Sequence, residues 1–100
     1  MTTVKWLSRP AIEIIHCEQL AEHGGLPGIR DENALEAALA RPLHKNNYGE
    51  EDLFCLAAAY LCGFARGHAF ADGNKRTAYL AAFTFLLING YLIEATQAEI

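Results

Sequence analysis

The 100-residue sequence is poor in charged residues, in β-branched residues and in long uninterrupted apolar runs. Hydrophobic side chains make up 52% and charged ones only 20%, which excludes a disordered tail. Alanine and leucine dominate the apolar set, which favours helices over strands. No run reaches the roughly 20 apolar residues of a membrane span, and the first ten residues lack a signal-peptide core. We therefore expect one cytoplasmic, all-α domain over residues 1–100, with no membrane partner.

Positive charge is also scarce overall. The formal net charge is −4, which argues against a general nucleic-acid binder held by phosphate attraction. One segment differs, because residues 60–80 hold Arg66, Lys75 and Arg76 against Asp72 alone. The local positive charge therefore marks this segment as a candidate anion site.

The cysteine and histidine spacings predict no metal site or disulfide framework. Cysteines occur at positions 17, 55 and 62, an odd number with no zinc-ligand pattern. We expect them to be buried free thiols, since free cysteine packs as a small hydrophobe. The histidines at positions 16, 23 and 44 have no metal-site spacing, and the sequence assigns them no role.

Two amphipathic helices are predicted in the first half of the chain. Ser8 is a good N-cap for a helix over residues 9–23, and Gly24-Gly25 would end it. Residues 24–31, GGLPGIRD, lack any nucleotide-binding glycine pattern, so we expect a shaped surface loop beside a site. Asp31 would cap the second helix.

The second helix is expected to bury Leu35, Ala38 and Leu39. Pro42 is expected to stop it, because proline lacks the backbone N–H and clashes with the preceding turn. Residues 42–50 would then form a polar connector to the next helix.

Residues 53–65 and 77–88 are apolar on nearly every face. Such a pattern is typical of central, buried helices. Asn89-Gly90 would end the second of these, residues 91–93 would be extended, and residues 97–100 are predicted to begin another helix. The fold class is therefore all-α, with two central helices joined by a polar loop.

That polar loop, residues 66–78 (RGHAFADGNKRTA), carries several groups that bind anions. Gly73 and Asn74 lie where the second central helix starts, so their backbone N–H groups are unpaired and can bind phosphate. Asn74 can add a side-chain hydrogen-bond donor, and Lys75 can add a positive charge. Arg76 can add a planar guanidinium group, which suits phosphate oxygens. Four donors in consecutive positions favour a polyphosphate ligand over a single carboxylate.

Three further residues of the loop suggest chemistry. Phosphate would repel Asp72 unless Mg²⁺ bridges the two. His68 can accept a proton from a hydroxyl that attacks phosphorus. Phe70 is the expected apolar anchor of the loop. From the residues alone, a phosphate-transfer site, an inert turn and a plain anion-binding or partner-binding surface all remain open.

The segment HAFADGNKRTA resembles the signature of the Fic/Doc superfamily, H-x-F-x-[DE/N]-[GA]-N-[GK]-R. The lysine after asparagine, the GGLPGIRD loop with its following ALEAAL helix, and FLLINGY are similar to the Doc (death-on-curing) toxin branch. The resemblance implies a compact helical Fic fold with two central helices, and a toxin of a type II toxin–antitoxin system. The chain ends near Ile100, earlier than this branch usually does, so one or two C-terminal helices are expected to be missing.

The resemblance also implies an activity and its partners. Doc-type toxins are kinases that transfer phosphate from ATP or another nucleoside triphosphate to a threonine or serine hydroxyl of elongation factor Tu, which stops translation. By the motif, His68 would be the base, Asp72 would hold Mg²⁺, and residues 73–76 would hold the nucleotide phosphates. A cognate Phd-like antitoxin would bind the active-site groove, and nucleic acid would not be bound directly.

Two alternatives remain at the level of the sequence. Fic-type enzymes transfer AMP, but Ala69 replaces the proline of their motif and Tyr79 stands where they place a second arginine. Lys75 also fills space that glycine leaves free in those enzymes. These differences favour kinase chemistry over AMP transfer. The second alternative is a catalytically inactive module that uses the same groove to bind an antitoxin.

Overall fold

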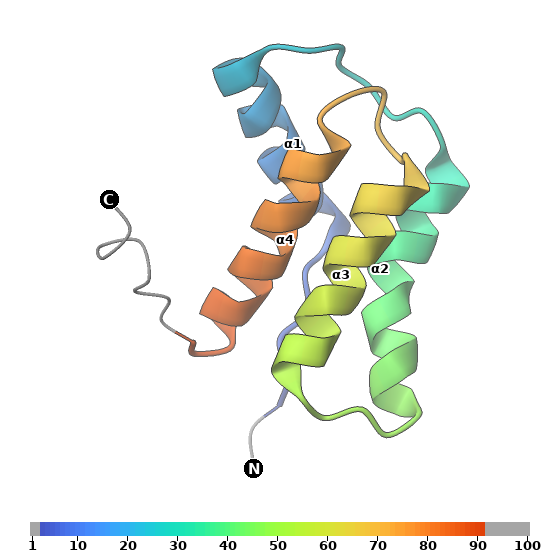
Figure 1. Cartoon of the computed structure of the whole chain (residues 1–100), viewed down its shortest axis with the longest axis vertical. Helices are drawn as coiled ribbons and strands as arrows, with labels where there is room; N and C mark the ends of the chain where they lie inside the picture. Colours follow the sequence, from blue (N-terminus) through green and yellow to red (C-terminus); the bar gives the residue numbers. More distant parts are fainter. Residues whose placement is uncertain (1–2, 92–100) are drawn as a thin grey trace.

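The computed structural model describes residues 3–91, and this part of the chain forms four α-helices. They are α1 (Arg9–His23), α2 (Glu32–Asn47), α3 (Leu53–Gly67) and α4 (Asn74–Ile88). Helix α3 packs between α2 and α4, and α1 packs against α4 (Figure 1). The predicted all-α class is confirmed. The helix predicted at residues 97–100, and all but the first residue of the predicted 91–93 segment, lie outside the described residues.

The first two helices begin at the N-caps that the sequence predicts, Ser8 and Asp31, and α3 begins at a cap of the same kind, Asp52. The side chains of Ser8, Asp31 and Asp52 each accept a hydrogen bond from a first-turn backbone N–H, at 3.2, 3.1 and 2.9 Å respectively. Such a cap typically stabilises a helix by about 1 kcal/mol. Gly24 ends α1 with φ of 80°, a conformation that costs glycine little.

The prediction that Pro42 stops the second helix is wrong. Helix α2 continues through Pro42 to Asn47, so most of the expected 42–50 connector is helical. Pro42 is buried and follows Leu35 and Ala38 at helical spacing on the same buried face. The burial of its ring against the core offsets the lost backbone hydrogen bond, which typically costs about 3 kcal/mol.

The core is formed where the buried faces of the helices meet. Its largest fully buried side chains are Ile12, Leu35, Leu56, Tyr60, Phe64, Phe70 and Phe85. The backbone N–H of Leu7 donates a hydrogen bond to the Tyr60 hydroxyl at 3.0 Å, which satisfies the one polar atom of that side chain. The ring of Trp6 stacks on Phe85 and covers this part of the core.

The expectation that both central helices are buried on all sides is wrong for the described residues. Phe54 on α3 is 53% exposed and Tyr79 on α4 is 69% exposed. Each of these helices packs against only two others, so one face of each remains uncovered. The cysteines also differ from expectation: Cys17 is exposed on the outer side of α1, and Cys55 and Cys62 are half-buried. None of the four helices is long and apolar enough to cross a membrane.

Candidate active site

The predicted polar loop connects α3 to α4 and lies beside the 24–31 loop at one end of the helices (Figure 1). The backbone N–H groups of Arg30 and Asp31 donate to the carbonyl of Ala69, at 2.7 and 3.1 Å. The N–H of Ala71 donates to the carbonyl of Gly28 at 3.0 Å. Residues 24–31 therefore form a wall that fixes the path of the α3–α4 loop.

Phe70 and His16 form the floor beneath this loop. Phe70 is 1% exposed, and its ring stacks on the His16 imidazole with centroids 3.8 Å apart and planes 11° apart. His16 is 4% exposed, and its Nε2 lies 2.8 Å from the carbonyl oxygen of Asp72. A carbonyl can only accept, so Nε2 carries the proton and donates. The loop is therefore held from below by a residue of α1.

His16 is the residue of this site that sequence reasoning missed. The sequence assigned it no role because its spacing to the other histidines fits no metal site. A signal was present, however, because His16 follows Ile12 at i+4 on the apolar face of α1. A histidine on a buried face needs a polar partner, and here the partner belongs to the loop.

Asp72 is exposed, and two backbone N–H groups hold its carboxylate. Its Oδ1 accepts from Gly73 at 2.9 Å, and its Oδ2 accepts from Leu26 at 3.3 Å. A Cβ added at Gly25 would lie 2.9 Å from Oδ2, so only glycine fits beside the carboxylate. Each carboxylate oxygen keeps acceptor capacity toward solvent.

This arrangement fits a Mg²⁺ ion that the protein binds through one carboxylate. Mg²⁺ is commonly held by one or two carboxylates together with substrate phosphates and water. Among residues 3–91, no group of three or more metal-ligating side chains is present. Asp72 would therefore have to share the ion with a phosphorylated ligand.

Helix α4 begins differently from the other three. Its N-cap is Gly73, with φ of 75° and no side-chain hydrogen bond to the first turn. The first backbone N–H groups of a helix have no intrahelical partner, so they point free toward the loop. The Asn74 side chain binds the loop itself: its Oδ1 accepts from the N–H of Phe70 at 3.0 Å, and its Nδ2 donates to the Phe70 carbonyl at 2.9 Å. One of its two amide hydrogens is thus already used within the protein.

All but one of the sequence-predicted site residues line a single hollow of about 590 Å³ at the start of α4. Its lining consists of Ala65, His68, Ala71, Asp72, Gly73, Asn74, Lys75 and Arg76. Phe70 is the exception, since it lies beneath the loop. His68 ends α3 in a left-handed conformation with φ of 51° and is exposed. Lys75 and Arg76 are exposed, and no described carboxylate pairs with either.

The hollow therefore combines a helix N-terminus, two cations, one carboxylate and one imidazole. The helix N-terminus and the cations suit phosphate oxygens, and the carboxylate suits a divalent cation. The imidazole is placed at the opposite end of the loop, where it can accept a proton from a second reactant. Chemically, such an arrangement is suited to hold a phosphorylated ligand beside a proton acceptor.

Comparison with known proteins places the chain within one family. The model of the Fic/DOC family matches residues 6–86. The protein kinase doc of Escherichia phage P1 is 40% identical over 88 residues, which cover 87% of this chain and 70% of that protein. Toxin Doc of Mycolicibacterium smegmatis is 49% identical over 75 residues, which cover 72% of this chain and 57% of that protein. The chain belongs to the Fic/DOC family, and the predicted resemblance to this family is confirmed.

Proposed function

We propose that this protein is a Doc-type kinase toxin, which transfers the γ-phosphate of a nucleoside triphosphate to a threonine or serine hydroxyl of a protein. Support comes from its similarity to a protein kinase doc and a toxin Doc. The observation that carries the proposal is the hollow at α4, where the uncapped helix N-terminus and two cations lie beside His68 and Asp72.

The nucleotide phosphates would bind at the N-terminus of α4. The free N–H groups of the first turn supply directed donors, and the helix dipole favours negative charge there. The absence of a side chain at Gly73 lets a phosphate approach the backbone closely. Lys75 and Arg76, both without a carboxylate partner among the described residues, would neutralise the charge that develops on the transferred group.

His68 would act as the general base. The hydroxyl oxygen of the target attacks the γ-phosphorus and gives its proton to the imidazole. The bond from the γ-phosphorus to the bridging oxygen breaks, and the nucleoside diphosphate leaves. His68 is exposed at the end of α3, so a protein hydroxyl can reach it from solvent.

Asp72 would hold Mg²⁺ against the bound phosphates. The ion would supply charge neutralisation of the leaving diphosphate. The contribution of this chain is to fix the carboxylate, which the N–H groups of Gly73 and Leu26 do from two sides. The absence of a side chain at Gly25 leaves the space that Oδ2 of this carboxylate occupies beside the 24–31 loop.

The proposed target is elongation factor Tu, whose phosphorylation would stop translation. The proposed regulator is a cognate Phd-like antitoxin that covers the groove containing His68 and Asp72. Such a partner would prevent both nucleotide binding and access of the target hydroxyl.

Expression in a bacterial host tests this function. We expect growth to stop when the wild-type chain is induced, and to continue with His68→Ala at equal protein level. Incorporation of labelled amino acids should fall in the arrested cells, since translation is the proposed target. Equal toxicity of wild type and His68→Ala would contradict a catalytic role, and it would instead support an inactive binding module.

A further inference from the structure

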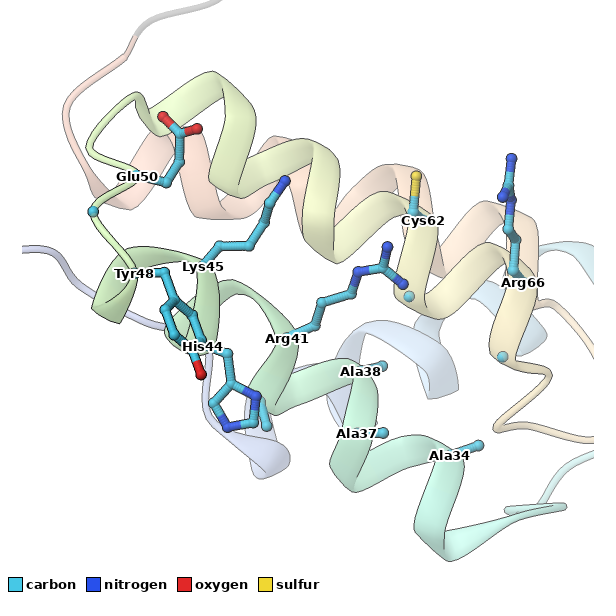
Figure 2. Close-up of a pocket in the computed structure, with 14 residues that line it drawn as sticks. Ala34, Ala37, Ala38, Arg41, His44, Lys45, Tyr48, Glu50, Cys62 and Arg66 are labelled. Atoms are coloured by element: carbon cyan, nitrogen blue, oxygen red, sulfur yellow. The ribbon is translucent and has the colours of Figure 1, made fainter.

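A second and larger hollow lies away from the α4 site, along the outer groove between α2 and α3 (Figure 2). Its volume is about 1080 Å³. On α2 it follows a stripe at helical spacing, residues 34, 37, 38, 41, 44, 45 and 48, and on α3 it follows residues 62, 63, 66 and 67. This stripe adjoins the face of α2 that packs into the core.

Small residues line the groove where its two helices meet. The helices lie close together at Gly63, since a Cβ added there would lie 3.2 Å from Ala38. The helices are less tightly packed at the end of the groove next to the α3–α4 loop. A Cβ added at Gly67 would meet only the Cβ of Ala34, at 3.9 Å. Close packing of the two helices therefore explains why residue 63 is a glycine, but it does not require a glycine at residue 67.

The rim of the groove carries positive charge that the described residues do not neutralise. Arg41, Lys45 and Arg66 line it against one carboxylate, Glu50, which already accepts a hydrogen bond from the N–H of Asp52. No described carboxylate lies within 4.0 Å of the three cations, whereas Arg9 pairs with three glutamates.

The dipoles of the helix C-termini account for only some of these three cations. Lys45 and Arg66 each lie in the last turn of a helix, where a cation is favoured by the dipole. Arg41 lies before the last turn of α2, and its side chain extends toward the turn of α3 that carries Cys62 (Figure 2). Such an exposed arginine beside an apolar floor is suited to contact an anionic group of a partner.

We propose that this groove binds an acidic segment of the protein substrate and thereby presents its hydroxyl to His68. This proposal rests on the function proposed above. Arg66 and Gly67 line the loop end of the groove, and His68 follows them directly. The lining of α2 from Ala34 to Lys45 extends over roughly 17 Å at 1.5 Å per residue, which suits about five extended residues or three helical turns.

A peptide fits this groove better than a nucleotide does. The floor supplies alanine methyl groups for apolar contact, and the rim supplies cations for Asp or Glu side chains. Unlike the hollow at α4, the groove is lined in a first helical turn by Ala34, whose backbone N–H already donates to the side chain of Asp31. Phosphate groups would therefore be held more weakly here than at α4.

Charge reversal of the rim tests the proposal. In phosphate transfer to purified elongation factor Tu, Arg41→Glu/Lys45→Glu should raise the KM for the protein by about ten-fold or more while the KM for ATP stays unchanged. The matched control is Lys5→Glu, an exposed cation outside the groove, which should change neither value. An unchanged KM for the protein, or an equal rise with Lys5→Glu, would overturn the proposal.

A direct binding measurement tests the groove proposal independently of the proposed kinase activity. The probe is a fluorescein-labelled peptide of about twelve alternating Glu and Ala residues, with a Lys–Ala peptide as its counterpart. By fluorescence polarisation, wild type and Lys5→Glu should bind the acidic peptide, and the double variant should bind it about ten-fold more weakly. Absence of binding, or displacement of the peptide by ATP alone, would refute the groove proposal. Binding without any phosphate transfer by the wild type would instead refute the kinase function.

Discussion

His16 on α1 donates a hydrogen bond to the backbone carbonyl of Asp72, 56 residues further along the chain, at 2.8 Å. The same imidazole stacks on the ring of Phe70. One side chain of α1 therefore holds both a buried side chain and a backbone carbonyl of the loop. His16 touches none of the reacting atoms of the proposed reaction. It is a positioning residue, and its contribution should appear in the rate of transfer.

The first prediction concerns this hydrogen bond. His16→Phe should keep the ring stack but leave the Asp72 carbonyl without its donor, which typically costs about 1–3 kcal/mol of stability. We expect kcat for phosphate transfer to fall by about ten-fold with little change in the KM for ATP. His16→Gln, which can donate from a similar position, should restore part of the rate. An equal loss in both variants would contradict a positioning role.

The second prediction compares two glycines of the 24–31 loop. Gly25 and Gly28 both have positive φ, 128° and 108°, so alanine strains the backbone at either position. Only at Gly25 does the added Cβ clash with the Asp72 carboxylate, at 2.9 Å, since nothing lies within 4 Å of a Cβ at Gly28. Gly25→Ala should therefore lower Mg²⁺-dependent ATP binding, measured by calorimetry, much more than Gly28→Ala does. Equal effects would show that Asp72 is not constrained by this contact.

The third prediction concerns the pair of hydrogen bonds between Asn74 and Phe70. Asn74→Asp keeps the acceptor but replaces the donor with a second oxygen facing the Phe70 carbonyl, 2.9 Å away in the wild type. We expect the free energy of unfolding to fall by about 1–3 kcal/mol. Urea unfolding followed by circular dichroism measures this change. A variant as stable as the wild type would mean that the amide does not hold the loop.

The fourth prediction concerns alkaline pH. Burial raises the pKa of Tyr60 above its usual value of about 10, and the hydrogen bond from the N–H of Leu7 lowers it by less. The folded state thus holds the phenol proton more tightly than the unfolded state, so the contribution of Tyr60 to stability is constant below about pH 10 and falls as the pH rises further. Tyr60→Phe should abolish this contribution, at a cost of about 1–3 kcal/mol for the unpaired N–H of Leu7. Tyr48→Phe, at a side chain that is 92% exposed, is the control and should retain the alkaline decrease.

The sequence predicted the elements that local chemistry determines. Ser8 and Asp31 mark helix starts because a cap acts on backbone groups within its own turn. The loop motif likewise placed a histidine at the end of one helix and a carboxylate and two cations at the start of the next, because these residues are close together in the chain. Pro42 was misjudged because its helix is maintained by burial against distant residues, which local propensity does not report.

Two features of the site depend on contacts that no local pattern contains. The role of His16 requires the docking of α1 under a loop that begins more than fifty residues later. The fixed position of Asp72 requires the 24–31 loop to lie against the start of α4, which brings the N–H of Leu26 to its carboxylate. The groove between α2 and α3 also depends on contacts between distant residues, since Arg66 on α3 joins Arg41 and Lys45 of α2 at its rim.

The proposed activity of this chain is the transfer of a phosphate and not of an AMP group. The direct test incubates the wild-type protein and His68→Ala with purified elongation factor Tu, Mg²⁺ and ATP labelled at either the γ- or the α-phosphate. We predict that γ-label alone appears on elongation factor Tu, and only with the wild type. Transfer of α-label would contradict the kinase assignment and establish AMP transfer, and γ-label transfer that survives in His68→Ala would contradict the role given to the histidine.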